Sequence, residues 1–225
     1  MTGHAIWSDF RGVLTPPLAE GIRTFCEGRD FSPAQLVECL RMVGRRYGYV
    51  DPMAVLDTGI LTERQWTREI EQSLAAGFGI GADLADFGAD WWSDRRVDRY
   101  WVAAVQSWRA RGTFVGLMSN LPVEWKPHFA SFADFAGLFD AVLLSCDVGA
   151  RKPEAKIFQE AEARSGLASR FNILVDDLAD NVAGARRAGW LGVHAGDEGA
   201  QGAVAEIESI LQPSDADDTH HEGVV

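Results

Sequence analysis

The sequence has few cysteines, no long apolar run and no run of basic residues, and each of these gaps excludes a class of protein. Its three cysteines, Cys26, Cys39 and Cys146, form an odd and widely spaced set, which argues against a disulfide framework or a zinc site and predicts buried free thiols. No apolar stretch approaches the roughly 18 residues that a membrane span needs. Because Asp9 and Arg11 interrupt the apolar residues near the start, we expect no signal peptide, no membrane partner and a cytoplasmic protein.

Basic residues are also in the minority, since 21 lysines and arginines face 33 acidic residues and give a formal net charge of −12. This balance argues against a nucleic-acid partner and favours a small-molecule substrate. A chain of 225 residues buries roughly 70% of its unfolded surface, which is enough for one core with an inserted subdomain. We expect a monomer or a homodimer.

Short apolar runs alternate along the chain with amphipathic stretches. This alternation is typical of a parallel sheet covered by helices, so the predicted fold class is α/β. The predicted strands are residues 5–9, 113–118, 141–145, 171–176 and 191–194.

The interval between the first two predicted strands is unusually long, about 100 residues where a strand–helix–strand crossover needs only about 30. Its signals are helical throughout: Ser32 before Pro33 predicts one helix start, and Thr62 with Gln65 forms a capping box that predicts another. Further helices are predicted at residues 16–26, 52–56, 83–92 and 97–111, the last of which feeds the second strand. We therefore expect a core of residues 1–15 and 93–212, an all-helical insertion of residues 16–92 and a disordered tail of residues 213–225.

Polar side chains stand where three of the apolar runs end and in one glycine- and proline-containing loop. Parallel strands place their carboxyl ends at one edge of a sheet, where open α/β folds bind ligands. Two neighbouring acids at such an edge repel one another unless a cation lies between them, and oxygen ligands of this kind suit Mg²⁺. The residues concerned are Asp9 in AIWSDFRGVLT, Ser119 and Asn120 after TFVGLM, Lys152 in GARKPE, and Asp176 with Asp177 after FNILV.

This ordered set resembles the motifs of the haloacid dehalogenase superfamily, and the likeness extends from Ile6 to about His194. The resemblance implies a Rossmann-like parallel sheet with a helical cap, and a Mg²⁺-dependent phosphatase that acts on a phosphate ester through an aspartyl-phosphate. It implies Asp9 as nucleophile, with the metal held by the Asp9 side chain, the backbone carbonyl of Arg11 and Asp177. Asp176 is expected either to join the metal's outer sphere or to hold Lys152.

The remaining site residues would act on the substrate. Lys152 is expected to bridge Asp9 and the phosphate with a compact positive charge. The Ser119 hydroxyl and backbone N–H would bind a phosphoryl oxygen, and Asn120 would orient that group. Trp91, Trp92 and Trp125 are candidates for the wall of the substrate pocket, although most buried aromatic side chains serve packing alone.

One position departs from the phosphatase pattern, because Arg11 stands where most phosphatases of the superfamily have a second aspartate. A guanidinium stays charged and cannot protonate the leaving oxygen, a service worth about 10²–10⁴-fold in rate. Arg11 could instead bind a phosphate or carboxylate of the substrate, or pair with a carboxylate of the cap. Two alternatives therefore stay open beside the phosphatase: a 2-haloacid dehalogenase-type hydrolase and a catalytically impaired ligand-binding protein.

Overall fold

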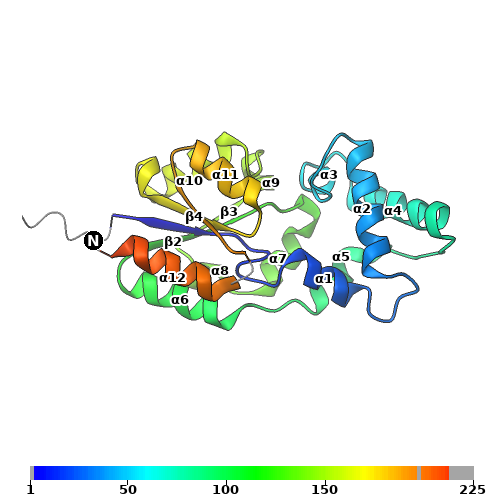
Figure 1. Cartoon of the computed structure of the whole chain (residues 1–225), viewed down its shortest axis with the longest axis horizontal. Helices are drawn as coiled ribbons and strands as arrows, with labels where there is room; N and C mark the ends of the chain where they lie inside the picture. Colours follow the sequence, from blue (N-terminus) through cyan, green and yellow to red (C-terminus); the bar gives the residue numbers. More distant parts are fainter. Residues whose placement is uncertain (1–2, 197–198, 213–225) are drawn as a thin grey trace, which may run out of the picture.

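The computed structural model describes residues 3–196 and 199–212 and contains a five-stranded parallel sheet (Figure 1). The strands lie in the order β3-β2-β1-β4-β5. Their bounds are β1 Ala5–Ser8, β2 Phe114–Ser119, β3 Ala141–Leu144, β4 Asn172–Asp176 and β5 Leu191–His194. The predicted α/β class and all five predicted strands are confirmed, with strand ends that differ by no more than one residue.

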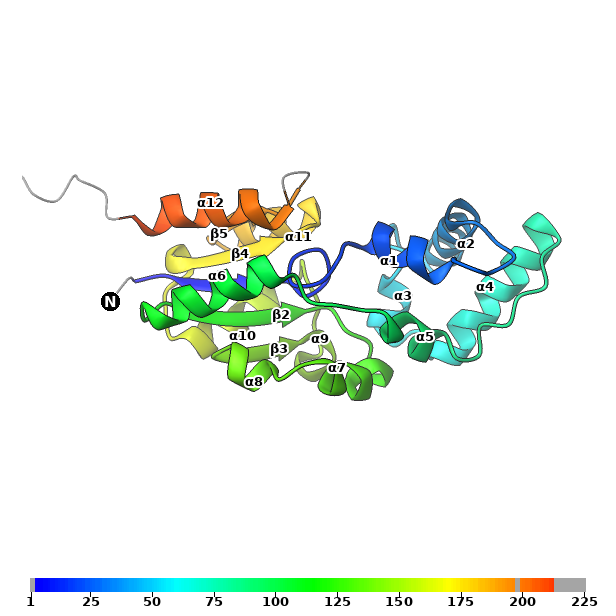
Figure 2. The same cartoon turned by 90° about the horizontal axis from the view of Figure 1, so that it is seen from below.

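Helices cover both faces of this sheet, with α10 and α11 on one face and α6 and α12 on the other (Figures 1 and 2). Both faces need cover because successive side chains of a strand point to opposite faces of the sheet. In β1, Ile6 packs in one apolar cluster and Trp7 in the other. The helices of this part are α6 Arg99–Ala110, η1 Val123–Trp125, α7 Lys126–Phe132, α8 Phe135–Leu138, α9 Ser145–Val148, α10 Ala155–Ser165, η2 Ser169–Phe171, α11 Ala179–Arg187 and α12 Gly199–Leu211.

The long interval after β1 forms a helical lobe beside the carboxyl edge of the sheet (Figure 2). Its helices are α1 Leu18–Phe25, α2 Pro33–Arg46, α3 Ala54–Asp57, α4 Glu63–Phe78 and α5 Phe87–Ser93. Both predicted helix starts are confirmed, since Ser32 with Gln35 and Thr62 with Gln65 form complete capping boxes. The division into a core and a cap at residues 16 and 92 remains an interpretation of this arrangement.

The largest error in a predicted helix start is at α5, which starts at Phe87, whereas the sequence pattern placed its start at residue 83. The backbone N–H groups before it are bound to side chains instead, Leu84 N–H donating to Glu71 at 2.8 Å and Ala85 N–H to Asp83 at 3.0 Å. Local side-chain acceptors thus compete with the helical hydrogen bonds.

Two further predictions concern the ends of the chain and its surroundings. The predicted disordered tail of residues 213–225 lies outside the described residues. None of the helices within residues 3–196 and 199–212 combines the length and the apolar character that a bilayer crossing requires.

The register of the sheet brings the motif residues together. Ser8 of β1 lies opposite Leu117 of β2 and Val175 of β4, so the residues that follow these positions emerge at the same edge. The Asp9 N–H donates to the Val175 carbonyl at 2.8 Å and extends this pairing by one step. Asp9, Ser119 and Asp176 are therefore neighbours although they are more than 50 residues apart in sequence.

Candidate active site

Lys152 is the centre of the site, and its side chain is 1% exposed. Its ammonium group donates to Asp9 Oδ1 at 2.6 Å, to Asp176 Oδ2 at 2.6 Å and to the Met118 carbonyl at 3.0 Å. Burial by itself lowers the pKa of Lys152, but the carboxylates of Asp176 and Asp9 outweigh it and hold that pKa above its usual value. Lys152 is thus a permanent positive charge between two acids.

Asn120 fixes the loop that carries this lysine. Its side-chain oxygen accepts the Lys152 backbone N–H at 2.8 Å, and its amide nitrogen donates to the Lys152 carbonyl at 3.0 Å. The sequence pattern predicted a contact between Asn120 and the substrate, whereas the structure places both amide atoms on the backbone of Lys152. Asn120 therefore positions the lysine.

The two neighbouring acids of β4 have different surroundings. Asp176 is fully buried, and its second oxygen accepts from Leu178 N–H and from the Asn181 amide, both at 2.9 Å. The expectation that Asp176 holds Lys152 is confirmed. Asp177 does not cap the following helix, since Leu178 precedes α11 and no side-chain hydrogen bond caps that helix. The Asp177 carboxylate is left for another partner.

Asp9, Asp176 and Asp177 form a group that could hold a metal ion, because one carboxylate oxygen from each lies within 4.8 Å of the others. Burial, partly offset by Lys152 and reinforced by the two other acids, raises the pKa of Asp9 to about 7. Burial and then the charge of Asp176 also raise the pKa of Asp177. Lys152 supplies one positive charge to these three acids, and Mg²⁺ would supply more through the all-oxygen ligands it prefers.

The backbone of Arg11 adds a further candidate ligand. The turn after Asp9 closes through Thr15, whose N–H donates to the Phe10 carbonyl at 2.8 Å and whose own carbonyl accepts from Gly12. Among the described residues, no backbone hydrogen bond ends on the Arg11 carbonyl. This carbonyl remains available for a cation, as the resemblance implies.

Gly12 allows the Asp177 carboxylate to lie close to the loop that follows Asp9. It adopts a positive φ of 89°, and a Cβ built there would lie 2.1 Å from the Asp177 carboxyl carbon. We predict that Gly12→Ala displaces the Asp177 carboxylate and weakens Mg²⁺ binding by at least about tenfold. Thermal unfolding with and without Mg²⁺ measures this, because a metal that binds the folded state raises the transition temperature.

Gly28→Ala is the matched control for that prediction. Gly28 also has a positive φ, 76°, but a Cβ there meets nothing within 4 Å. Both variants should lose stability from left-handed backbone strain, and only Gly12→Ala should lose the stabilisation by Mg²⁺. Equal stabilisation by Mg²⁺ in the two variants would remove Asp177 from the metal site.

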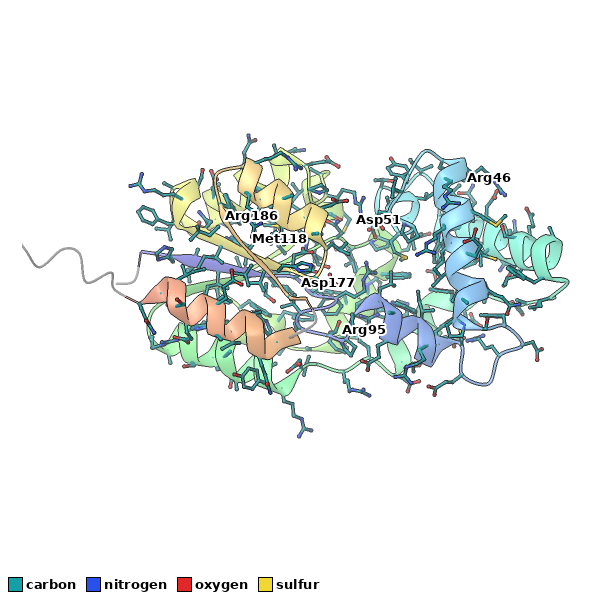
Figure 3. All side chains as sticks on the ribbon, in the orientation of Figure 1. Arg46, Asp51, Arg95, Met118, Asp177 and Arg186 are labelled. Atoms are coloured by element: carbon teal, nitrogen blue, oxygen red, sulfur yellow. The ribbon has the colours of Figure 1, made fainter. Side chains whose placement is uncertain are left out.

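The site opens into a cavity of about 510 Å³, part of it open solvent, between the sheet edge and the helical lobe. Asp9, Arg11, Ser119, Asn120 and Lys152 line it, so the cavity brings these five predicted site residues together. The three tryptophans considered from the sequence, Trp91, Trp92 and Trp125, line it as well. Figure 3 shows Asp177, Arg95 and Asp51 near the junction of sheet and lobe.

The sequence pattern missed a set of ion pairs that joins the helical lobe to the loop that carries Lys152. Arg151 donates to Asp57 at 3.2 Å and also to Asp51, and all three residues line the cavity. Burial raises the pKa of Asp57 to about 6, even though Arg151 and Arg11 oppose the shift. The position of Arg151 next to Lys152 was the available signal, but its partners lie about 100 residues away and share no motif with it.

Comparison with known proteins is informative at the level of the fold. No protein-family model matches the chain. The sesquiterpene phosphatase astK of Aspergillus oryzae is 27% identical over 102 residues, which are 44% of this chain and 50% of that protein. The chain thus spans about half the length of this curated relative.

Solved structures match nearly the whole chain. The HAD family enzyme bt-2542 of Bacteroides thetaiotaomicron, in complex with magnesium and inorganic phosphate, is 17% identical with a TM-score of 0.55 and covers 85% of this chain and 93% of its own. The L-2-haloacid dehalogenase of Xanthobacter autotrophicus is 16% identical with a TM-score of 0.64 and covers 95% and 85%. The chain therefore has the α/β fold of the haloacid dehalogenase-like hydrolases, which confirms the resemblance noted in the sequence.

Proposed function

We propose that this chain, with its haloacid dehalogenase-like fold, is a Mg²⁺-dependent phosphatase of a small phosphate ester that acts through an aspartyl-phosphate on Asp9. One observation carries the proposal: three carboxylates gather at the sheet edge, and among the described residues only Lys152 forms an ion pair with any of them. A divalent cation would complete the charge balance that a phosphoryl-transfer site needs. The match to a curated phosphatase and the magnesium and phosphate bound in a structure of the same fold support this reading.

In the first chemical step, an Asp9 carboxylate oxygen attacks phosphorus as the bond to the ester oxygen breaks. Lys152 holds that carboxylate at 2.6 Å and keeps it oriented. In the second step, water attacks phosphorus, the bond to Asp9 breaks, and inorganic phosphate leaves with Asp9 restored. Mg²⁺, held by Asp9, Asp177 and the Arg11 carbonyl with Asp176 behind them, would neutralise charge on the transferred phosphoryl group.

Arg11 sets the class of leaving group. No hydrogen bond or ion pair joins its side chain to another of the described residues, and it lines the cavity beside Asp9. Since a guanidinium donates no proton at neutral pH, the ester oxygen has to leave largely as an anion. We therefore infer a substrate with a good leaving group, such as an acyl phosphate or a phosphate on a sugar anomeric oxygen.

A carbon–halogen hydrolase is the second candidate, because a haloacid dehalogenase shares the fold over 95% of this chain. In that reaction Asp9 would attack carbon and release halide, and the acid missing at position 11 would not be needed. The Asp177 carboxylate argues against it, since a negative charge beside Asp9 would serve no purpose without a cation.

The test is a panel of phosphate esters and 2-haloacids, each assayed with Mg²⁺ and with EDTA. We expect phosphate release that requires Mg²⁺ and is fastest for esters with acidic leaving groups. Halide release in EDTA would instead establish the dehalogenase. No turnover of either class, with retained phosphate binding, would identify an impaired ligand-binding protein.

A further inference from the structure

Four cationic side chains line the cavity that holds Asp9, and two of them have no carboxylate partner within the described residues. Lys152 pairs with Asp9 and Asp176, and Arg151 pairs with Asp51 and Asp57. Two other cations line the same cavity, Arg11 and Arg95, and neither forms an ion pair with any carboxylate in the part of the chain that the structure describes. A phosphoryl group at Asp9 would use part of this unpaired charge but leaves Arg95 unaccounted for.

Arg95 lies in the segment between α5 and α6, surrounded by aromatic rings rather than by acids. Its guanidinium carbon is 5.1 Å from the ring centre of Trp92, 5.3 Å from that of Trp91 and 5.6 Å from that of Phe10. One terminal nitrogen donates to the Thr15 hydroxyl at 3.0 Å. The rings and this bond hold the guanidinium in place without neutralising it.

The side chain also has unused hydrogen-bonding capacity. Arg95 Nε is buried and has no acceptor. Burial, and then the neighbouring charge of Arg11, lower the pKa of Arg95 to about 10. A buried donor without an acceptor and two like charges close together are both unfavourable, and an anion between them would relieve both.

Other buried donors on the same cavity lack acceptors too. The indole nitrogen of Trp92 and Nε of Arg151 have no partner, and both residues line the cavity with Arg95. Of the buried side-chain atoms without a partner among the described residues, only Trp66 Nε1 belongs to a residue outside this lining. The missing partners are therefore acceptors, and three of the four donors that lack them belong to residues that line this cavity.

We propose that Arg95, with the indole N–H of Trp92, binds a second anionic group of the substrate, a carboxylate or a further phosphate, beside the phosphoryl group that Asp9 attacks. This inference rests on the proposed function and narrows it to phosphate esters that carry two anionic groups. The planar guanidinium suits oxyanions of either kind, and the aromatic rings exclude water around it, which strengthens the contact.

Equilibrium binding of three unreactive probes in excess Mg²⁺ tests the proposal without turnover. Methylphosphonate offers one anionic group, phosphonoacetate adds a carboxylate, and methylenediphosphonate adds a second phosphoryl group. The protein should bind one or both of the two-anion probes about 10–100-fold more tightly than methylphosphonate, and the tighter of the two identifies the second group. Arg95→Met should remove most of that preference and leave the affinity for methylphosphonate unchanged.

Arg96→Met is the matched control, because Arg96 is exposed, pairs with Glu20 and does not line this cavity. It should keep the full preference. Arg95→Lys retains the charge and the apolar stem, so it should keep part of the preference and provides the answer if Arg95→Met does not fold. Equal affinity for all three probes in the unmodified protein, or an equal loss for all three in the folded Arg95 variants, would overturn the proposal. The proposed function fails separately, if no phosphate ester is hydrolysed.

Discussion

Asp9→Asn is expected to abolish phosphate release, with kcat lowered by at least about 10³-fold at saturating Mg²⁺. The amide keeps the size of the carboxylate but lacks the negative charge and the nucleophilic oxygen that forms the covalent intermediate. Asp9 is 7% exposed and its side chain bonds to Lys152, so its chemistry cannot readily be taken over by water or by a surface acid. Released phosphate, measured on the best ester of the panel, is the readout.

Asp180→Asn is the control for this variant. Asp180 is exposed in the first turn of α11, three residues after Asp177, so the change removes the same charge near the site without touching it. It should keep essentially full activity. Turnover by Asp9→Asn within about tenfold of the unmodified protein would show that Asp9 is not the nucleophile.

The strands could be predicted from the sequence because each is a short apolar run bounded by polar or turn residues. In a parallel sheet buried on both faces, such a run is the pattern that burial requires. Helix starts were predicted well at Ser32 and Thr62, where the capping side chains are local in sequence. The start of α5 was predicted wrongly, because the Leu84 N–H donates to Glu71, and that contact depends on how the lobe packs.

Among the site residues too, those that follow from a local sequence pattern were predicted, and those that depend on long-range packing were missed. Asp9, Ser119 and Asp176 follow from one rule, since the carboxyl ends of parallel strands meet at one edge. Arg95 was missed because its significance comes from Thr15, 80 residues away, and from rings contributed by both the sheet edge and the lobe. The spacing of residues in the sequence does not reveal that an arginine will have no carboxylate partner in the fold.

The paired acids illustrate what geometry adds to a motif. The resemblance implied Asp177 as the acid that holds the metal, and it left Asp176 either in the metal's outer sphere or bound to Lys152. In the structure both carboxylate oxygens of Asp176 accept hydrogen bonds, from Lys152, the Leu178 N–H and Asn181. The Asp177 carboxylate instead lies against Gly12, in the loop that follows Asp9. The positive φ and missing side chain of Gly12 are thus the local condition for the proposed metal site.

Lys152→Met is expected to have the largest effect on stability, lowering the free energy of unfolding by about 3–5 kcal/mol at pH 8. Methionine fills a similar volume but leaves Asp9 and Asp176 buried without their shared cation. For a chain of this size, the transition temperature should fall by roughly 6–20 °C. Activity should fall with it, since the nucleophile loses the group that orients it.

The pH dependence separates this effect from a simple packing defect. The folded protein holds the pKa of Lys152 above its unfolded value, so the lysine itself stays charged in both states from pH 5.5 to 8 and loses its charge only at more alkaline pH. The pH dependence in this range therefore comes from its carboxylate partners. In the variant, loss of the cation removes the charge that opposes the effect of burial and so raises the pKa of Asp9 further, and the folded state binds more protons than the unfolded state at mildly acidic pH. Stability then falls as pH rises, and urea unfolding at pH 5.5 and pH 8 should show a markedly larger loss at pH 8.

Lys156→Met gives the matched comparison, since Lys156 is exposed on α10, four residues beyond Lys152. It should change the free energy of unfolding by no more than about 0.5 kcal/mol at either pH. Mg²⁺ should recover part of the loss in Lys152→Met at pH 8, because it can bind the carboxylates that the lysine no longer neutralises. A loss that is the same at both pH values and indifferent to Mg²⁺ would mean that the buried lysine contributes only its volume, and the electrostatic account of the site would be wrong.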